Sequence, residues 1–329
     1  MTFSDPLQPF LNDQDVVILD GGLATELESR GADLRDELWS ARLLIVDPQA
    51  IRQLHLDYFK AGADVAISAS YQASFEGFAR RGLGRDQSAR VMQRSVRLAK
   101  EARDQFWDER AYDPMETGRR RPLVAASVGS YGAFLADGSE YLGAYGLSDG
   151  ELREWHRPRL EALLAAEPDL LACETVPCMQ EGEVLVELLA EYSDTAAWMS
   201  FSCRDGNNLF SGEPFDACIA LTSSGPNVVA VGLNCTAPRF AKQLLLSAKE
   251  KTCKPLVCYP NSGEVWDSCA RTWVSGQKED RFLDLAATWK TAGASLVGGC
   301  CRTTPADILA LRSLLLPHST HVTVGRKKQ

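Results

Sequence analysis

Short apolar runs recur along the whole chain, and most are followed by a segment with the spacing of an amphipathic helix. Each run is a few residues long, rich in Val, Ile, Leu and Ala, and bounded by Gly, Pro, Asp or Asn, which is typical of a strand buried on both faces. The pattern predicts eight strands, within residues 15–22, 63–70, 122–130, 169–175, 196–203, 227–235, 254–260 and 294–301.

Capping signals mark several of the helices between these strands. Asp47 directly before Pro48 predicts a helix start, and Gly62 predicts the end of that helix. Ser148 with Glu151 three residues later has the pattern of a capping box. Helical periodicity also covers 23–30, 87–107, 179–192 and 282–292, and begins again at Pro238.

Alternation of buried strands with helices predicts a parallel sheet that is covered by helices. Eight such units in a chain of 329 residues favour a closed (β/α)8 barrel over an open sheet. The first strand is followed by Asp-Gly-Gly-Leu-Ala-Thr, which lacks the glycine spacing of a dinucleotide-binding turn. No linker divides the chain, so residues 1–329 are expected to form one barrel domain, with a short N-terminal lead-in and a polar tail from about 317. The charged segment 108–121 is predicted to be a surface loop.

Composition limits the possible partners and location. The net charge of −9 argues against a nucleic-acid or anionic-membrane surface. No apolar run approaches the roughly 18 residues of a membrane span, and the N-terminus lacks the pattern of a secretory signal. Ten cysteines without the spacing of a disulfide framework suggest reduced thiols in a cytoplasmic protein. A monomer or a small homo-oligomer is expected.

Three cysteines stand at the predicted ends of strands six and eight: Cys235, Cys300 and Cys301. In a closed barrel only strand seven separates these two strands, so the three thiols are expected to converge at the end of the barrel where active sites form. Three thiolates with an open fourth position are typical of a catalytic zinc site, which predicts one Zn²⁺ per chain. The alternative is that the cysteines are small packing residues, since free cysteine is often buried.

The adjacent pair Cys300–Cys301 imposes a condition on the eighth strand. Neighbouring residues on a regular strand point to opposite faces, so both thiols reach one ion only if the strand has already ended. The preceding Gly298–Gly299 permits such a break. Just beyond it, Thr303 or Thr304 is expected to cap a helix that starts at Pro305.

A site with three thiolates favours a particular chemistry. Such a zinc ion carries a net negative charge, generates hydroxide poorly, and binds an incoming thiol as a nucleophilic thiolate. This predicts alkylation of a substrate thiol, with no catalytic side chain beyond the metal-activated thiolate. If the alkyl donor is a sulfonium or an ammonium, the leaving group departs neutral and no general acid is needed.

Acidic and aromatic residues at the strand ends suit a small amino-acid substrate. Asp20 and Glu174 are expected to bind an ammonium group through charge-assisted hydrogen bonds. Backbone N–H groups of Gly21–Gly22 or Asn261–Gly263 are candidates for binding its carboxylate. A cationic methyl donor would contact aromatic rings by cation–π attraction, and the candidates are Trp39, Tyr71, Tyr131 and Tyr259.

Motifs along nearly the whole chain resemble those of the homocysteine S-methyltransferase family, zinc-dependent barrels that methylate homocysteine to methionine. The most specific are Gly-Leu-Asn-Cys and Gly-Gly-Cys-Cys-Arg around the three cysteines, and Tyr-Pro-Asn-Ser-Gly-Glu after strand seven. The others are Leu19–Gly22, Ser70–Ala73, Ala136–Tyr141 and Glu174–Thr175.

The resemblance implies roles for particular residues. Cys235, Cys300 and Cys301 would be the zinc ligands, and Asp20 and Glu174 would bind the amino group of homocysteine. The remaining candidates for substrate binding that lie in the shared motifs are Gly21, Gly22, Ser70, Gln72, Asn234, Tyr259, Asn261 and Ser262.

The resemblance leaves the methyl donor open. Its motifs favour S-methylmethionine, with S-adenosylmethionine as a second sulfonium, while a betaine-type donor is an alternative. Two further readings stay open on the residues alone. One is a barrel enzyme for a phosphorylated metabolite, suggested by glycines after strands seven and eight. The other is a catalytically silent zinc-binding or thiol-sensing protein.

Overall fold

The computed structural model describes residues 4–34, 38–110, 119–267, 272–274 and 281–316. Eight parallel strands form one sheet in the order β1-β10-β7-β6-β5-β4-β3-β2, and a parallel bridge between Leu19 and Val65 joins its two edges into a barrel. The strands are β1 (Val17–Ile18), β2 (Val65–Ile67), β3 (Leu123–Gly129), β4 (Leu170–Val176), β5 (Ala197–Phe201), β6 (Val228–Asn234), β7 (Leu256–Tyr259) and β10 (Ala294–Val297).

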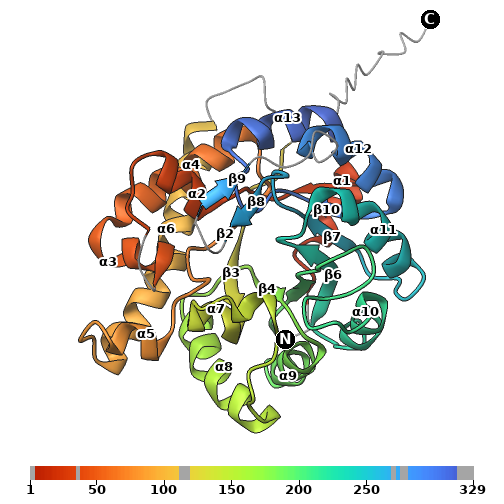
Figure 1. Cartoon of the computed structure of the whole chain (residues 1–329). Coiled ribbons are helices and arrows are strands. Elements are labelled where there is room, and N and C mark those ends of the chain that lie inside the picture. The colour runs from red at the N-terminus through yellow and green to blue at the C-terminus, as the bar shows by residue number, and fades with distance from the viewer. Residues whose placement is uncertain (1–3, 35–37, 111–118, 268–271, 275–280, 317–329) are drawn as a thin grey trace, which may run out of the picture.

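Helices form an outer ring around this barrel (Figure 1). Those that follow the strands include α2 (Leu23–Ser29), α4 (Pro48–Ala61), α6 (Arg85–Arg110), α8 (Asp149–Leu164), α9 (Met179–Leu189), α10 (Phe215–Thr222), α11 (Pro238–Lys249), α12 (Phe282–Ala292) and α13 (Pro305–Leu315). All eight predicted strands are present, and each lies within its predicted range except β4, which ends one residue beyond it at Val176, so the (β/α)8 barrel is confirmed.

The capping predictions are confirmed as well. The side chain of Asp47 accepts a hydrogen bond from the Ala50 amide at the start of α4, and Gly62 ends that helix with φ of 111°. Ser148 forms the capping box with Glu151 at the start of α8. Of the two threonines considered for α13, Thr304 is the cap, and it forms a second capping box with Asp307.

Several elements were not predicted. They are the short helices α1 (Gln8–Gln14), α3 (Leu43–Val46), α5 (Phe75–Ala79) and α7 (Tyr131–Leu135), the 3-10 turns η1 (Trp39–Arg42) and η3 (Ser139–Tyr141), and the hairpin strands β8 (Val265–Asp267) and β9 (Thr272–Val274). Most lie in loops, where periodicity is too short to signal an element. The polar tail predicted from about 317 lies outside the described residues.

The prediction that 108–121 is a surface loop is wrong at its start, residues 111–118 lie outside the described residues, and residues 119–121 are outside any helix or strand with Arg120 and Arg121 exposed. The first residues of the segment continue α6, which ends at Arg110. At the other end, Arg119 has a nearly buried side chain that donates hydrogen bonds to the carbonyls of Phe59 and Ala63. A charged side chain becomes buried where backbone carbonyls and a carboxylate satisfy it, and sequence periodicity does not register such partners.

The core has two layers that follow the alternation of each strand. Outward-facing strand residues such as Ile18 pack against the helices, and inward-facing ones such as Val17 and Leu19 fill the barrel. Helix α1 contributes Leu7 and Phe10 to the inner cluster. The helix therefore buries apolar side chains against the barrel interior, which explains why the lead-in is ordered.

A buried carboxylate ties the N-terminal helix, the first strand and the last helix together. Asp64 is fully buried just before β2, and its Oδ2 accepts hydrogen bonds from the Gln14 side chain at 2.6 Å and the Ile18 amide at 3.0 Å. Its Oδ1 pairs with Arg312 at 2.9 Å and with Arg119 at 3.4 Å. These partners come from distant parts of the chain, so Asp64 stabilises the closure of the barrel.

We expect Asp64→Asn to lower the free energy of unfolding by about 3 kcal/mol, because removing one partner leaves buried guanidinium groups without their counter-charge. Urea denaturation of the metal-free protein measures this. Asp57→Asn is the matched control, since Asp57 pairs with Arg30 at the surface, and it should cost less than about 1 kcal/mol. Equal losses for the two variants would show that Asp64 has no special role in closure.

Candidate metal and substrate site

Three thiols meet at the C-terminal end of the barrel. Cys235 directly follows β6, Cys300 and Cys301 follow β10, and β7 lies between these strands. The three Sγ atoms all lie within 4.8 Å of one another, and those of Cys235 and Cys301 are 3.9 Å apart. Sulfur atoms about 2.3 Å from a tetrahedral zinc ion are separated by about 3.8 Å. The donor set and its spacing therefore fit a metal ion that prefers sulfur.

The predicted break in the eighth strand is present, since β10 ends at Val297. A Cβ atom on Gly298 would lie 2.5 Å from Cβ of Leu19, and one on Gly299 would lie 2.2 Å from Oγ1 of Thr303. The two glycines are therefore required because other segments approach them closely, and neither has a positive φ. This close approach places both following cysteines beside Cys235.

Backbone hydrogen bonds join the loops that carry the thiols. The amide of Cys235 donates to the Tyr259 carbonyl at 3.3 Å, and that of Cys300 donates to the Pro260 carbonyl at 2.8 Å. The Ser262 amide donates to the Cys301 carbonyl at 3.0 Å, and the Gly299 amide donates to the Asp20 carbonyl at 3.0 Å. The ends of β6, β7, β10 and β1 are thus joined to one another by backbone hydrogen bonds.

Three residues of the site have backbone conformations that are unusual for L-amino acids. Thr175, Cys235 and Arg302 have φ of 57°, 47° and 65°. Each such residue costs on the order of 1 kcal/mol and persists where surrounding contacts hold it. The side chain of Asn234 supplies one such contact, because its oxygen accepts from the Thr175 amide and its nitrogen donates to the Thr175 hydroxyl. The structure thus places Asn234 as a link between β4 and β6.

The thiols influence one another's protonation. Hydrogen bonds from the Cys300 and Cys301 thiols hold the pKa of Cys235 well below its usual range, while the pKa values of Cys300 and Cys301 rise. A single thiolate stabilised by two thiols is the state expected of a thiol cluster in the absence of a cation. A divalent ion would allow all three groups to ionise together.

Glu174 is buried at the end of β4 and is held by three other strands. Its Oε1 accepts a hydrogen bond from the Ser127 hydroxyl, and its Oε2 accepts one from the Tyr259 hydroxyl at 3.1 Å. The same Tyr259 oxygen accepts from the Trp198 indole at 3.1 Å and contacts the Ser200 hydroxyl at 2.6 Å. Burial raises the pKa of Glu174 to about 7, and repulsion from Cys300 adds to this effect.

Asp20 lies beside this carboxyl group, at the end of β1. It is buried, and its Oδ2 accepts a hydrogen bond from the Ile67 amide at 2.8 Å. Burial raises the pKa of Asp20 well above its usual range, with a further contribution from repulsion by Glu174 and Cys300. The structure therefore brings both predicted acids to the thiols. A cation bound between Asp20 and Glu174 would relieve the repulsion between these two carboxyl groups, which no cationic side chain among the described residues is seen to offset.

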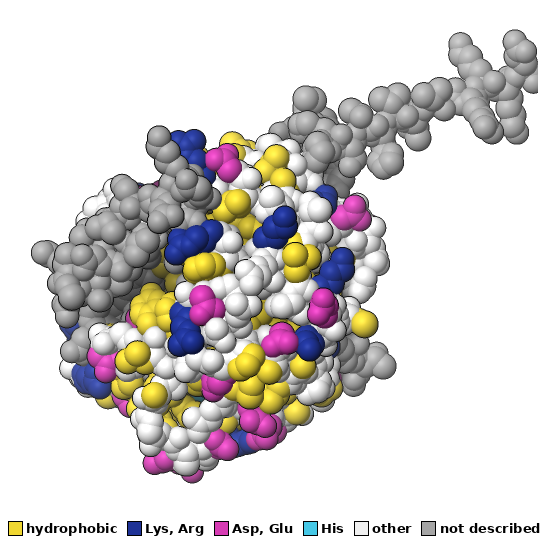
Figure 2. Space-filling view, turned by 45° about the vertical axis from the view of Figure 1, so that its right-hand side comes forward, with side chains coloured by type: hydrophobic (Ala, Val, Ile, Leu, Met, Phe, Trp, Pro, Cys, Tyr) yellow, Lys and Arg dark blue, Asp and Glu magenta, His cyan; other side chains and the backbone are white. Residues whose placement is uncertain are grey.

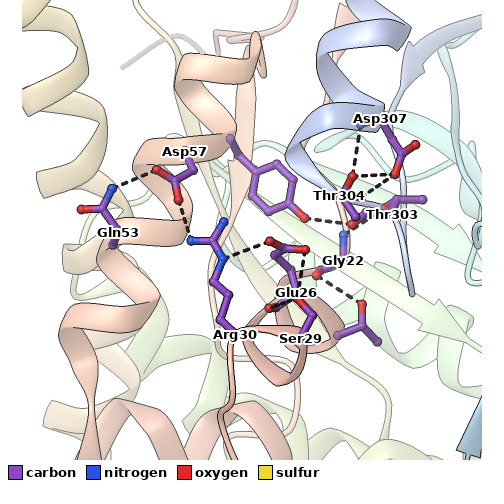
Figure 3. A network of polar contacts seen from close by, with 11 residues as sticks. Gly22, Glu26, Ser29, Arg30, Gln53, Asp57, Thr303, Thr304 and Asp307 are labelled. Atoms are coloured by element: carbon purple, nitrogen blue, oxygen red, sulfur yellow. Dashed lines mark hydrogen bonds and ion pairs between the residues drawn. The ribbon is translucent and has the colours of Figure 1, made fainter.

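The backbone amides considered for a substrate carboxylate are largely occupied. The amide of Gly22 donates to the carbonyl and the hydroxyl of Thr303, and the Tyr58 hydroxyl donates to the same carbonyl at 3.0 Å (Figure 3). A Cβ atom on Gly21 would lie 2.9 Å from both Tyr58 and Thr303. The Gly21–Gly22 turn therefore packs against the start of α13, which is a structural reason for its glycines.

The candidates after β2 and β7 are positioned differently. The Ser70 hydroxyl is buried and donates to the Ser127 carbonyl at 2.8 Å, and the Asn261 amide donates to the Thr236 carbonyl at 3.1 Å. The Ser262 hydroxyl accepts from the Glu264 amide at 3.3 Å. By contrast, the side-chain oxygens of Gln72 and Asn261 are buried and have no hydrogen-bond partner among the residues described. These two acceptors are available to a ligand.

One of the predicted aromatic residues is placed beside the thiols. The phenol of Tyr71 hydrogen-bonds with Thr175, and nearby Cys235 and Glu140 contribute to raising its pKa. Tyr131 instead packs in an aromatic cluster with a ring centroid 4.9 Å from that of Trp155, and Tyr259 lies in the barrel interior. Trp39 lies in η1, and its side chain is outside the described residues.

Other site residues were not predicted. Ser127 positions Glu174 directly, and Trp198 does so through Tyr259. Tyr141 lies close enough to Cys235 and Cys301 for their charges to raise its pKa. Ser127 left a signal in the sequence, since it is a polar residue inside an apolar strand. Cys173 and Cys203 are buried in the core.

The surface away from the site has mixed character. On the face shown in Figure 2, acidic and basic side chains alternate, with hydrophobic side chains in small groups between them. In the described part of the chain, no helix has both the length and the apolar character that crossing a bilayer requires.

The fold and the site together define a (β/α)8 barrel enzyme with a three-thiol centre at the C-terminal ends of its strands. The family model of homocysteine S-methyltransferase matches residues 17–315. Homocysteine S-methyltransferase YbgG of Bacillus subtilis is 46% identical over 92% of this chain and 96% of its own. Homocysteine S-methyltransferase of Escherichia coli is 48% identical over 95% of this chain and 99% of its own.

A solved structure agrees with these relatives. The metallated form of the homocysteine methyltransferase MmuM from Escherichia coli has a TM-score of 0.84 and 47% identity, over 94% of this chain and 100% of that one. The chain belongs to the homocysteine S-methyltransferase family.

We expect Cys235→Ala to abolish stoichiometric metal binding, because two thiols in an open site hold a divalent ion far less tightly than three. Metal analysis after dialysis measures the bound ion per chain. Cys253→Ala is the control, since Cys253 is an exposed thiol between α11 and β7, and it should bind as much metal as the unmodified protein. Full metal content in the Cys235→Ala protein would exclude this centre.

The raised pKa of Glu174 predicts a pH dependence of stability in the metal-free protein. The folded state holds this proton up to about pH 7, whereas the unfolded chain loses it near 4.5. The free energy of unfolding should therefore fall by about 3 kcal/mol as pH rises through this window. Glu174→Gln should flatten the fall, measured by denaturation at several pH values. An unchanged slope in the variant would show that other groups cause it.

Proposed function

We propose that the three thiols bind one zinc ion and that the enzyme transfers a methyl group from a sulfonium compound to homocysteine. S-Methylmethionine is the proposed donor, with S-adenosylmethionine as a second sulfonium that the same chemistry accepts. The observation that carries the proposal is the juxtaposition of three Sγ atoms within 4.8 Å with two buried carboxyl groups, Asp20 and Glu174.

The donor set of the site supports zinc over a harder ion. Thiolate ligands select zinc and other soft metals, whereas magnesium and calcium prefer oxygen. When bound, zinc would lower the pKa of the substrate thiol so that it is present as a thiolate at neutral pH. Three protein ligands would leave the fourth position of a tetrahedral zinc ion for that substrate atom.

The protein groups around the sulfurs would hold the rest of homocysteine. Asp20 and Glu174 are buried acceptors that lack a cation among the residues described, and an ammonium group would satisfy both. The hydrogen bonds from Ser127 and Tyr259 fix the carboxyl group of Glu174 in place. Asp20 and Glu174 would orient homocysteine so that its sulfur points at the donor methyl group.

The electrostatics of the site suit a cationic donor. In the transfer, a sulfur–carbon bond forms at homocysteine while the donor's sulfur–methyl bond breaks, and the electron pair stays with the departing thioether. The leaving group is neutral, so no side chain needs to protonate it. The negative charge of the thiols and acids would attract the sulfonium and exclude anions.

The alternative function, a barrel enzyme that acts on a phosphorylated metabolite, finds little support in the structure. A phosphate at the ends of strands seven and eight needs free backbone amides. Here the amides of Asn261, Ser262, Gly298, Gly299 and Cys300 all donate to backbone carbonyls. The neighbouring thiols and carboxyl groups would repel the phosphate as well. We also place the enzyme in the cytoplasm, where the thiols remain reduced.

We expect the zinc-loaded enzyme to form methionine from homocysteine with S-methylmethionine, more slowly with S-adenosylmethionine, and very little with betaine. Chelation should abolish turnover and added zinc should restore it, because the thiol of homocysteine is mostly protonated at neutral pH without a metal. A methionine assay with each donor measures this. Full activity after complete removal of metal would overturn the zinc proposal, and a preference for betaine would overturn the donor.

A further inference from the structure

A turn beside the thiols carries a carboxylate that the proposed homocysteine site does not use. Glu140 lies in η3, between α7 and α8 along the chain. Its Oε2 is shielded from solvent and has no hydrogen-bond partner among the residues described. An unpaired buried carboxylate oxygen is costly unless a ligand satisfies it. This turn belongs to the segment Ala136–Tyr141, one of the shared sequence motifs.

The charge of Glu140 acts on the mouth of the barrel. Its negative charge contributes to raising the pKa values of Tyr71 and Tyr141, and it opposes the lowering of the Cys235 pKa. Glu140 is therefore close to the sulfur cluster. Asp20 and Glu174 repel each other, and the acidic neighbour of Glu140 is Asp137, while Glu140 and Glu174 both act on Tyr71 and Cys235. Glu140 therefore adds a third carboxyl group to the mouth of the barrel.

Local packing fixes the turn that presents Glu140. A Cβ atom on Gly132 would lie 2.5 Å from the Glu140 amide nitrogen, so η3 packs directly on α7. The side chain of Asp137 accepts a hydrogen bond from the Ser139 amide at 2.9 Å, and the ring of Tyr141 packs on Phe210 with centroids 5.0 Å apart. These contacts hold the turn in place, and backbone hydrogen bonds at Gly138 and Glu140 reach the carboxyl group, but its Oε2 has no partner among the described residues.

A second unsatisfied acceptor belongs to a side chain that contacts α7, the helix on which η3 packs. The side-chain nitrogen of Gln72 donates to the carbonyl of Ala133 in α7, and its oxygen is buried without a partner among the described residues. Gln72 and Glu140 therefore both contact α7, and both leave an acceptor unpaired. Two acceptors beside the Tyr71 and Tyr141 rings match a ligand that has N–H donors as well as a cationic centre.

We propose that Glu140, together with the Gln72 side-chain oxygen, binds the α-ammonium group of the methyl donor and so selects amino-acid sulfoniums over sulfoniums or ammoniums that lack an N–H donor. This inference rests on the proposed methyl transfer. Betaine has no N–H group, so it would leave both acceptors unpaired. A site that forms hydrogen bonds to a substrate group discriminates strongly against an analogue without it.

The test compares two sulfonium donors in the zinc-loaded full-length enzyme. S-Methylmethionine carries the ammonium group, and dimethylsulfonioacetate does not. With Glu140→Gln we expect kcat/KM for S-methylmethionine to fall about tenfold or more, the loss expected when a charge-assisted hydrogen bond becomes neutral. The KM for homocysteine and kcat/KM for dimethylsulfonioacetate should change less than about twofold.

Glu154→Gln is the matched control, because it makes the same change of side chain at an exposed position on α8. It should leave the ratio of the two donors unchanged, and thermal unfolding shows whether either variant alters the fold. A rise in the KM for homocysteine with Glu140→Gln, or equal losses with both donors, would overturn the assignment of Glu140. Absence of turnover with either donor in the unmodified enzyme would instead overturn the proposed function.

Discussion

Mutual repulsion among acidic groups is the constraint on which the rest of this site depends. Three thiols and two carboxyl groups share the C-terminal end of one barrel, and burial raises the pKa of Asp20 and of Glu174. Groups of like charge do not assemble in a low dielectric by themselves. The barrel brings them together because its parallel strands all end on the same side, and apolar packing elsewhere offsets the cost.

Backbone links hold this arrangement together. The loops after β1, β6, β7 and β10 are joined by amide–carbonyl hydrogen bonds, and the side chain of Asn234 joins β6 to β4. The left-handed conformations of Thr175 and Cys235 are stable only within such a frame. The hydrogen bonds between the loops use backbone atoms alone, so they leave the three thiol groups free to act as ligands.

The sequence was sufficient to predict the barrel, since buried parallel strands leave local apolar runs and capping residues act within a few positions. The cysteine trio was predictable for a related reason, because the order of strands in a barrel places residues 235 and 300 close together. The role of Asp64 was not predictable, since its partners Gln14, Ile18, Arg119 and Arg312 come from distant segments. Local patterns do not encode such contacts.

Glu140 shows the same limit within the site. Its motif could be noticed in the sequence, but its importance depends on an unpaired oxygen that becomes visible only when α7, η3 and Tyr71 are placed in space. In the proposed transfer, Asp20 and Glu174 would bind the ammonium group of homocysteine, and Glu140 would bind that of the donor. A donor without an ammonium group would then leave Glu140 unpaired, and this is the physical basis of the proposed preference for an amino-acid donor.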